Sequence, residues 1–218
     1  MNNDNQNLSL SQQAYHKIRH KIITLELVPG AVIDEASLRS ELGFGRTPIR
    51  EALQRLALEK LVTIVPRRGM FVTEIGITDL QRLFEMRLVL ETLATRLAVQ
   101  RGTAVHWDQM EQILTDIPEI EELTNEQLIY VDEQCHKIIY EATGNLFLQD
   151  TLKMIFALSL RLWYFSLSEI GDMTAAVNEH WQIMEAFRDG DVDDATALMT
   201  KHIQKFQDEI QAVMLGTR

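Results

Sequence analysis

The sequence predicts a mainly α-helical protein of two domains: a winged helix-turn-helix domain over residues 1–75, then an all-α bundle of six helices over residues 76–218. Three observations predict this fold. The first third carries short helical patterns that end in two strand patterns, the remainder is almost entirely helical, and the charge balance changes sign near residue 75. Residues 1–75 hold 10 Lys and Arg against 8 Asp and Glu, whereas residues 76–218 hold 11 against 24. Such an asymmetry suggests that the two domains have separate roles.

The composition indicates a globular protein of a reducing compartment. A hydrophobic fraction of 46% over 218 residues excludes disordered and collagen-like chains. The single cysteine, Cys135, excludes an intrachain disulfide. The first residues, MNNDNQN, lack the apolar core of a signal peptide, and the longest apolar stretch, MIFALSLRLWYFSLS, is too short to cross a bilayer. We therefore expect a cytoplasmic protein with no membrane partner.

The first third contains three predicted helices. The first is predicted over residues 11–26 from apolar residues at three- and four-residue spacing, which are Tyr15, Ile18, Ile22 and Leu25. Asp34 can cap a second helix, ASLRSEL, which is expected to end at Gly43. Thr47 is expected to cap the third helix, with Pro48 in the first helical position, where its missing N–H costs nothing.

Two strand patterns, LVTIV and MFVTEI, follow the third helix, and the basic turn at residues 66–69 connects them. In a winged helix-turn-helix, the N-terminal residues of the third helix meet base edges in the major groove. Arg46 and Arg50 would lie at that end, and guanidinium groups suit guanine edges and phosphates. The basic turn suits a backbone or minor-groove contact. The alternative is that these arginines are solvated surface charges.

From Thr78 onward the pattern is almost entirely helical. Breaks at Pro118, Gly144-Asn145, Gly171 and Gly190 separate six predicted helices, near residues 78–101, 106–114, 122–142, 146–169, 173–188 and 191–214. A bundle of this size can bury its own core and leave a cavity between helices.

Histidine placement is the most informative feature of the helical part. Asp132 and His136 lie four residues apart in YVDEQCHKIIY, so both project from one helix face. His180 and His202 each lie among apolar residues at helical spacing. Three imidazoles and one carboxylate that face a helical interior form a candidate ligand set for zinc, nickel or another divalent transition metal. The alternative for each histidine is a hydrogen-bonded core residue.

Arg87 is the candidate residue for binding an effector carboxylate. Its neighbours along the first helix of the bundle are apolar, so its guanidinium is expected to be partly buried and to need a partner. The alternative is a structural ion pair with Glu91 or Asp150.

Residues 11–73 resemble the DNA-binding domain of the GntR family of bacterial transcription regulators. The matching segments are LVPG at 27–30, LxxELG at 38–43, RTPIREALxRL at 46–56 and PxxGxxV at 66–72. The resemblance implies that the start of the third helix and the wing glycine contact operator DNA, which places these contacts on Arg46, Thr47, Arg50 and Gly69. Ala36 stands where some members carry arginine, and Arg39, one turn later, is the candidate replacement. The DNA-binding candidates also include Pro48, Arg55, Arg67 and Arg68.

The helical part resembles the FCD ligand-binding domain, which defines the FadR subfamily of GntR regulators. The shared order is Asp-x3-His, then Gly-Asn, then Glu-His, then a last His 22 residues later. In many members the aspartate and histidines hold a metal, and a small organic acid completes its coordination. The resemblance implies that the metal ligands are Asp132, His136, His180 and His202, with zinc or nickel favoured and manganese or iron as alternatives.

Two further features bear on this resemblance. Six helices rather than seven resemble the VanR-like branch of the subfamily. Cys135 stands where a phenylalanine commonly precedes the first histidine. We interpret Cys135 as a packing residue, with a thiolate ligand as the alternative.

The resulting hypothesis is a homodimeric, metabolite-responsive regulator, by family default a repressor, that binds a near-palindromic operator and a small carboxylate effector. One alternative is a metal-dependent enzyme that uses the same Asp/His set. Against it, Glu133 and Glu179 are expected to point to other helix faces, so no general base accompanies the set, and the winged domain would be unexplained. A third possibility is a regulator whose cluster is purely structural.

Overall fold

The protein consists of two compact units, Met1–Gly76 and Ile77–Arg218. The computed structural model describes residues 8–117, 123–167, 169 and 174–216 of them. The boundary between the units lies one residue from the expected one. The breaks expected at Pro118 and Gly171, and the helix boundaries expected at residues 122 and 173, lie outside the described residues.

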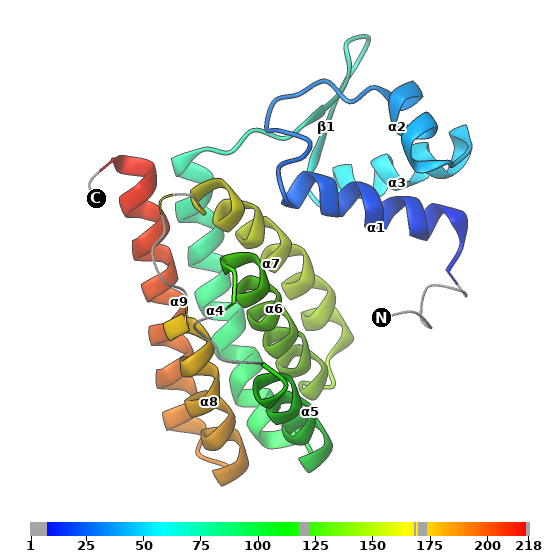
Figure 1. Ribbon diagram of the computed structural model, residues 1–218. Coiled ribbons are helices and arrows are strands. Elements are labelled where there is room, and N and C mark those ends of the chain that lie inside the picture. The colour runs from blue at the N-terminus through cyan, green and yellow to red at the C-terminus, as the bar shows by residue number, and fades with distance from the viewer. Residues whose placement is uncertain (1–7, 118–122, 168, 170–173, 217–218) are drawn as a thin grey trace. The chain divides into compact units, whose positions relative to one another are not determined.

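The first unit is a winged helix-turn-helix, as predicted (Figure 1). Its elements are α1 (Leu10–Ile23), α2 (Glu35–Leu42), α3 (Arg46–Leu58), β1 (Val62–Val65) and β2 (Gly69–Val72). The two strands pair antiparallel, with Val62 opposite Val72 and Val65 opposite Gly69. The apolar stripes of the helices meet in a core whose fully buried side chains include Ile18, Ile22, Ile49, Leu53, Leu56 and Leu61.

The ends of α2 follow the local sequence. Asp34 caps the helix by accepting a hydrogen bond from the backbone N–H of Ala36 at 2.8 Å. Gly43 ends it in the left-handed conformation, with a φ of 73° that glycine adopts at no steric cost. Both predictions for this helix are confirmed.

Two other predicted boundaries are wrong. Gly45, not Thr47, is the N-cap of α3, so Pro48 is the third helical residue. Proline is tolerated there because the first four N–H groups of a helix have no partner within it. The first helix ends at Ile23 because Leu25 has a φ of 61°, outside the helical region.

Gly30 occupies a position that requires glycine. Its φ is 77°, and its N–H donates a hydrogen bond to the carbonyl oxygen of Val72 at 2.9 Å. A Cβ added at Gly30 would lie 2.5 Å from Oε1 of Glu74. The carboxylate of Glu74 could move aside, so it is the left-handed φ that favours glycine here, because glycine adopts it at no steric cost.

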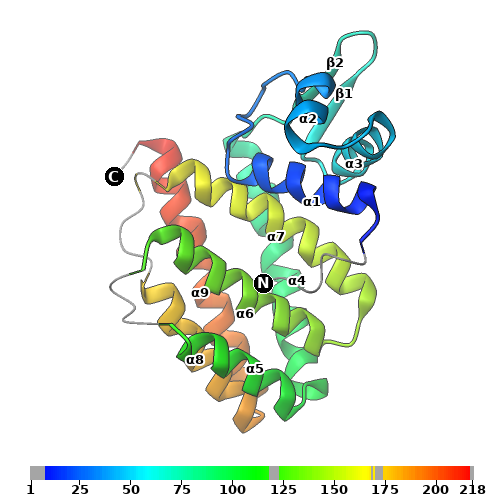
Figure 2. The ribbon, with the colours of Figure 1, turned by 45° about the vertical axis from the view of Figure 1, so that its right-hand side comes forward.

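The second unit is a helical bundle, which Figures 1 and 2 show from two sides. Its helices are α4 (Ile77–Arg101), α5 (Ala104–Thr115), α6 (Asn125–Ala142), α7 (Leu146–Ser166), α8 (Thr174–Asp189) and α9 (Val192–Leu215). The described residues thus contain the six predicted helices, although α7 ends before residue 169. Helix α4 packs against α6, α7 and α9, and α8 packs against α5, α6 and α9. None of the described helices is long and apolar enough to cross a membrane.

The N-terminal cap of α9 allows a test of how much one capping side chain contributes to the free energy of unfolding. The side chain of Asp191 accepts hydrogen bonds from the backbone N–H groups of Asp193 at 3.1 Å and Asp194 at 2.9 Å. Asp191→Ala should lower the free energy of unfolding by about 0.5–2 kcal/mol. Asp191→Asn keeps the acceptor and should lose much less. Urea unfolding, followed by the fluorescence of the three tryptophans that all lie in this unit, measures both changes; equal losses would assign the effect to charge instead.

Candidate metal centre and nucleic-acid interface

A buried group of one carboxylate and three imidazoles lies inside the bundle. Asp132 and His136 come from α6, His180 from α8 and His202 from α9. One ligand-type atom from each residue lies within 4.8 Å of the others. The packing of three helices therefore brings together the four residues that the sequence singles out.

Oδ1 of Asp132 faces Nε2 of all three histidines. The separations are 3.9 Å to His136, 3.7 Å to His180 and 3.3 Å to His202. Atoms bound to one ion at 2.0–2.2 Å lie roughly 3–3.5 Å apart, so the observed spacing is close to that of a coordination shell. Among the described residues, Oδ1 of Asp132 and Nε2 of His180 have no hydrogen-bond partner although both are buried. The donor types and these two atoms fit a divalent transition metal.

The other ring nitrogen of each histidine faces an acceptor. The acceptors are Oε2 of Glu91 for His136 at 3.3 Å, the carbonyl oxygen of Ala176 for His180 at 2.9 Å, and Oε2 of Glu179 for His202 at 2.8 Å. A proton on Nδ1 that is donated to such an acceptor leaves the lone pair of Nε2 directed into the cluster. All three imidazoles are therefore held in the orientation that metal ligation requires.

Burial and neighbouring charges shift the pKa values of three residues of the cluster. Burial raises the pKa of Asp132, but the neighbouring imidazoles, that of His136 first, outweigh it and hold the pKa well below its usual range. Burial lowers the pKa of His202, but the carboxylates of Asp132 and Glu179 beside it raise that pKa to about 9. His202 therefore has to release one proton before its Nε2 can bind a metal. Burial and the charge of His202 lower the pKa of His180 to about 3. The carboxylate therefore stays ionised and gives the cluster an anionic ligand.

The expectation that Glu179 points to another helix face is wrong. Its carboxylate accepts from Nδ1 of His202 at 2.8 Å and from Nζ of Lys205 at 3.0 Å. The sequence shows that Glu179 precedes His180, but only the packing of α8 against α9 brings it to His202. Its position follows the histidine-orienting pattern of metal sites, in which ligand histidines donate to carboxylates.

Arg87 forms the ion pair with Glu91 that the sequence offered as an alternative. Nε of Arg87 lies 3.2 Å from Oε1 of Glu91, and the two side chains are 3% and 0% exposed. The guanidinium also lies over three aromatic rings, those of Phe84, Phe156 and Phe206. Nη2 of Arg87 lies 3.5 Å from Nε2 of His136. One end of the guanidinium thus faces the cluster while the other is paired.

Cys135 is buried in α6 and is not a member of the group that could hold a metal. Burial raises the pKa of its thiol well above the usual range. Since only the thiolate ligates metals well, this position favours packing over ligation.

Removing one partner of the Arg87–Glu91 pair should lower the free energy of unfolding strongly, whereas replacing both partners with apolar residues should lower it little. Glu91→Ala should lower the free energy of unfolding by about 3–5 kcal/mol, because it leaves Arg87 buried without its carboxylate. Arg87→Met combined with Glu91→Leu removes both charges at similar volume and should restore most of that loss. Urea unfolding monitored by tryptophan fluorescence compares the two. A double variant as unstable as the single one would show that His136 or Tyr140, rather than Arg87, requires Glu91.

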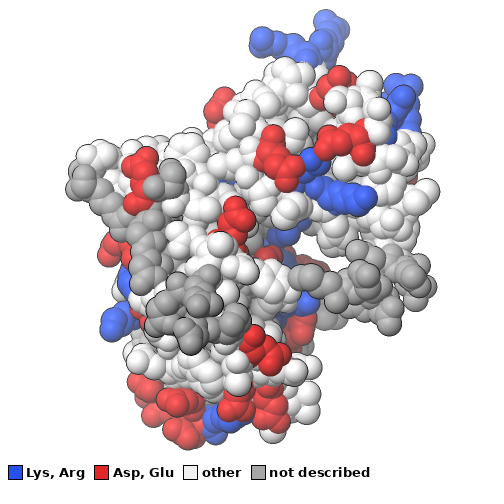
Figure 3. Space-filling view, viewed as in Figure 1, with Lys and Arg blue, Asp and Glu red and all other residues white. Residues whose placement is uncertain are grey.

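Most DNA-binding candidates lie exposed in two places on the winged unit. The N-terminal end of α3 carries Arg46, Thr47 and Arg50, with Pro48 half-buried among them, and the hairpin turn carries Arg67, Arg68 and Gly69. Figure 3 shows Lys and Arg side chains projecting from this unit, and a group of acidic side chains at one end of the bundle. Arg39 is exposed on α2, and Arg50 lies 3.8 Å from Glu35.

Arg55 lies in a different environment. It belongs to the last turn of α3, and its guanidinium lies 3.8 Å from the centroid of the Tyr15 ring. Its Nε lies 3.2 Å from Oε1 of Glu59, which also accepts from the hydroxyl of Tyr15 at 3.0 Å. These contacts tie α3 to α1, so packing accounts for this arginine, and its role in DNA binding stays a prediction.

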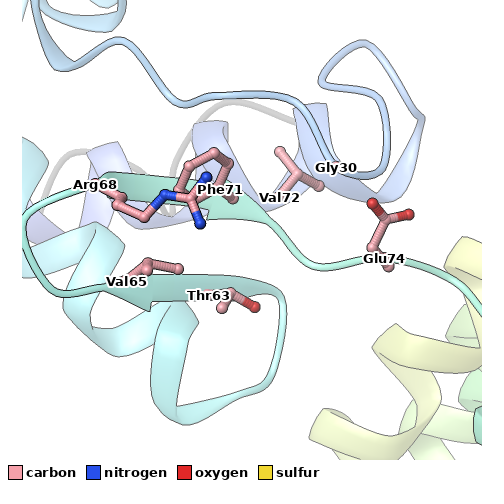
Figure 4. Close-up of a pocket in the computed structure, with 7 residues that line it drawn as sticks. All are labelled: Gly30, Thr63, Val65, Arg68, Phe71, Val72 and Glu74. Atoms are coloured by element: carbon pink, nitrogen blue, oxygen red, sulfur yellow. The ribbon is translucent and has the colours of Figure 1, made fainter.

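The wing also carries a surface pocket of about 260 Å³ (Figure 4). Its lining residues are Gly30, Thr63, Val65, Arg68, Phe71, Val72 and Glu74. Figure 4 shows Arg68 beside Phe71 on β2 and Glu74 at the opposite end, beside Gly30. Because its two charged groups do not converge, we assign this pocket no ligand.

A winged helix-turn-helix joined to a helical bundle with a buried Asp/His cluster defines a class of DNA-binding transcription regulators. The family model for bacterial regulatory proteins of the gntR family matches residues 10–72, and the FCD domain model matches residues 82–205. The chain therefore belongs to the GntR family and carries an FCD domain, as in the FadR subfamily. It is a regulator and not an enzyme, and GntR regulators of this kind bind operator DNA and small effectors.

Known relatives agree with this assignment. The Nta operon transcriptional regulator of Aminobacter aminovorans is 29% identical over 188 residues, which cover 86% of this chain and 88% of that protein. The HTH-type transcriptional repressor RspR of Escherichia coli is 24% identical over 205 residues, 94% of this chain and 90% of RspR. The structure of E. coli McbR/YncC superposes with a TM-score of 0.84 at 21% identity, covering 97% of this chain and all of that one. At that identity the superposition shows the shared fold alone.

Proposed function

We propose that this regulator holds one divalent transition metal at Asp132, His136, His180 and His202 and responds to a small carboxylate effector. The convergence of four buried ligand-type side chains is the observation that carries the proposal. When bound there, a divalent cation supplies a Lewis-acid position for an oxygen ligand of the effector. Zinc and nickel suit imidazole and carboxylate donors best, and manganese and iron also accept them.

Arg87 is the proposed effector-binding residue. Its Nη2 lies 3.5 Å from Nε2 of His136, so a carboxylate beside the cluster would also meet a guanidinium. Glu91 pairs with the Nε side of Arg87, which fixes the guanidinium and leaves the Nη2 side directed at the cluster. The three phenylalanine rings around Arg87 exclude water and strengthen its attraction for an anion.

We propose further that the protein acts as a homodimer on a near-palindromic operator and represses, in the cytoplasm. Two-fold dimers match two-fold operators. The first turn of α3 would read base edges, and the wing would contact the backbone. RspR, which is a repressor by name, supports repression. The effector can change operator affinity only if it binds two states unequally, and a coupling of about 1–3 kcal/mol corresponds to a five- to 150-fold change.

Elemental analysis tests the metal centre. Protein purified without chelator or an affinity metal should carry about one divalent metal per chain, because the four ligands form one site. His202→Ala removes one ligand and should lose that metal. The absence of metal in both proteins, even after soaking with zinc or nickel, would reduce the four residues to hydrogen-bonding core groups. If chelation and reloading leave the operator affinity unchanged with every small acid, the centre is purely structural.

Arg50→Ala should weaken binding to an operator selected from a random duplex pool by about 1–3 kcal/mol, because Arg50 reads a base. Its affinity for random duplex DNA should change much less. Lys137→Ala, which removes an exposed charge of the same sign from α6, is the matched control and should change neither. Equal losses on operator and random DNA at matched salt would make Arg50 a phosphate contact.

A further inference from the structure

Helix α4 contributes none of the four metal-ligand candidates, yet it is joined to the cluster by polar contacts. The candidates lie on α6, α8 and α9. Two residues of α4 reach the cluster, Arg87 and Glu91, and both lie on its buried face. Glu91 is fully buried, at 0% exposure, so its carboxylate depends wholly on the partners that the bundle supplies.

The carboxylate of Glu91 contacts three polar side chains. Its Oε2 lies 3.3 Å from Nδ1 of His136, its Oε1 accepts from the hydroxyl of Tyr140 at 2.5 Å, and the same oxygen lies 3.2 Å from Nε of Arg87. Arg87 in turn lies 3.5 Å from Nε2 of His136. Both ring nitrogens of one candidate ligand, His136, therefore face α4.

Glu179 provides a contrast within the same site. It also accepts from Nδ1 of a candidate ligand, His202, but its second partner is Lys205. Those residues belong to α8 and α9 alone. One carboxylate thus orients a ligand within the set of ligand-bearing helices, whereas the other connects a ligand to a helix outside that set.

Helix α4 is also the first helix after the winged unit along the chain. It begins at Ile77, and only residues 73–76 separate it from the end of β2 at Val72. A change in the position or stability of α4 would therefore act directly on the connection to the DNA-binding unit.

We propose that the Arg87–Glu91 pair couples the metal centre to α4, and thereby to the connection with the winged unit. This inference rests on the proposed function. When Nε2 of His136 is held in the cluster, its Nδ1 fixes the carboxylate of Glu91, which fixes Arg87. When His136 is not held, its ring can turn, and the buried pair loses a partner that it cannot replace with water. Because an incomplete buried polar network is costly, α4 then has a separate arrangement or opens more readily.

Apolar packing is the competing route. Helix α4 also packs against α9, where the rings of Phe84 and Phe206 lie 5.3 Å apart between centroids. Since α9 carries His202, a response of α4 could pass through this packing without Glu91.

Hydrogen exchange measured by mass spectrometry on the full chain, with and without saturating zinc, separates the two routes. Three proteins are compared: the wild type, the double variant Arg87→Met/Glu91→Leu, and the matched control Glu179→Leu. Zinc alone is the probe, so the proposed role of Arg87 in effector binding does not enter. Both variants should bind zinc about ten- to 100-fold more weakly, because each loses a partner of a ligand histidine. Zinc stoichiometry is therefore confirmed for each protein, and urea unfolding confirms that each is folded.

In the wild type, zinc should slow hydrogen exchange in α6, α8 and α9. It should also slow exchange in α4, on the order of five- to 150-fold. In Glu179→Leu, once saturated, α4 should still slow. In the double variant, α6, α8 and α9 should slow while α4 changes less than about twofold. Slowing of α4 to the wild-type extent in the double variant would overturn the inference in favour of packing.

Two further outcomes separate this inference from the proposed function. A wild-type protein that binds zinc and slows in α6, α8 and α9 but not in α4 would overturn the coupling and leave the metal centre standing. A wild-type protein that binds no zinc and slows nowhere would overturn the metal centre and the coupling together.

Discussion

The buried charges of the helical unit constrain the rest of its structure. Asp132, Arg87 and Glu91 are almost completely removed from water, and each would be strongly destabilising without a partner. The bundle meets this requirement by directing imidazoles at Asp132 and by pairing the other two charges on one face of α4. Helices α4, α6, α8 and α9 must therefore keep their mutual positions for the core to remain satisfied, and this constraint builds the candidate metal centre.

The same constraint links the stability of the bundle to the proposed metal site. An apolar core could hold the helices together equally well, but it would offer no atoms that could bind a cation. Polar atoms that lack a partner among the described residues, Oδ1 of Asp132 and Nε2 of His180, leave the centre incomplete in a way that a cation can satisfy. The carboxylates of Glu91 and Glu179 lie behind two of the candidate ligand imidazoles, on the Nδ1 side, and leave Nε2 facing the centre.

The two units differ in charge as well as in fold. The first turn of α3 and the wing expose arginines that have no role in the core, while the acidic residues concentrate in the helical unit. Arg55 shows that composition alone is an incomplete guide, because its guanidinium stacks on Tyr15 and pairs with Glu59. Position at the N-terminal end of α3 therefore makes a basic residue a candidate for DNA contact, whereas the contacts of Arg55 also give it a packing role.

The sequence by itself determined the elements and their order. Helical periodicity and capping residues are local signals, because each depends only on residues a few positions apart. They allowed the six helices of the bundle, the wing and the α2 boundaries at Asp34 and Gly43 to be predicted. The spacing of Asp132 and His136 is equally local. The start of α3 was misplaced because Gly45 caps it without a side-chain hydrogen bond, which leaves no sequence signal.

Only the tertiary structure decided which distant residues meet. Three sets of contacts show this: the convergence of α6, α8 and α9 on one centre, the contact of Glu179 with His202, and the link from Arg87 and Glu91 to His136. They join residues of different helices that lie 22 to 70 positions apart in the sequence. Such contacts depend on how whole helices pack, and local spacing fixes only the face on which a side chain lies. The sequence therefore identified the candidate ligands, while packing supplied the partners that orient them.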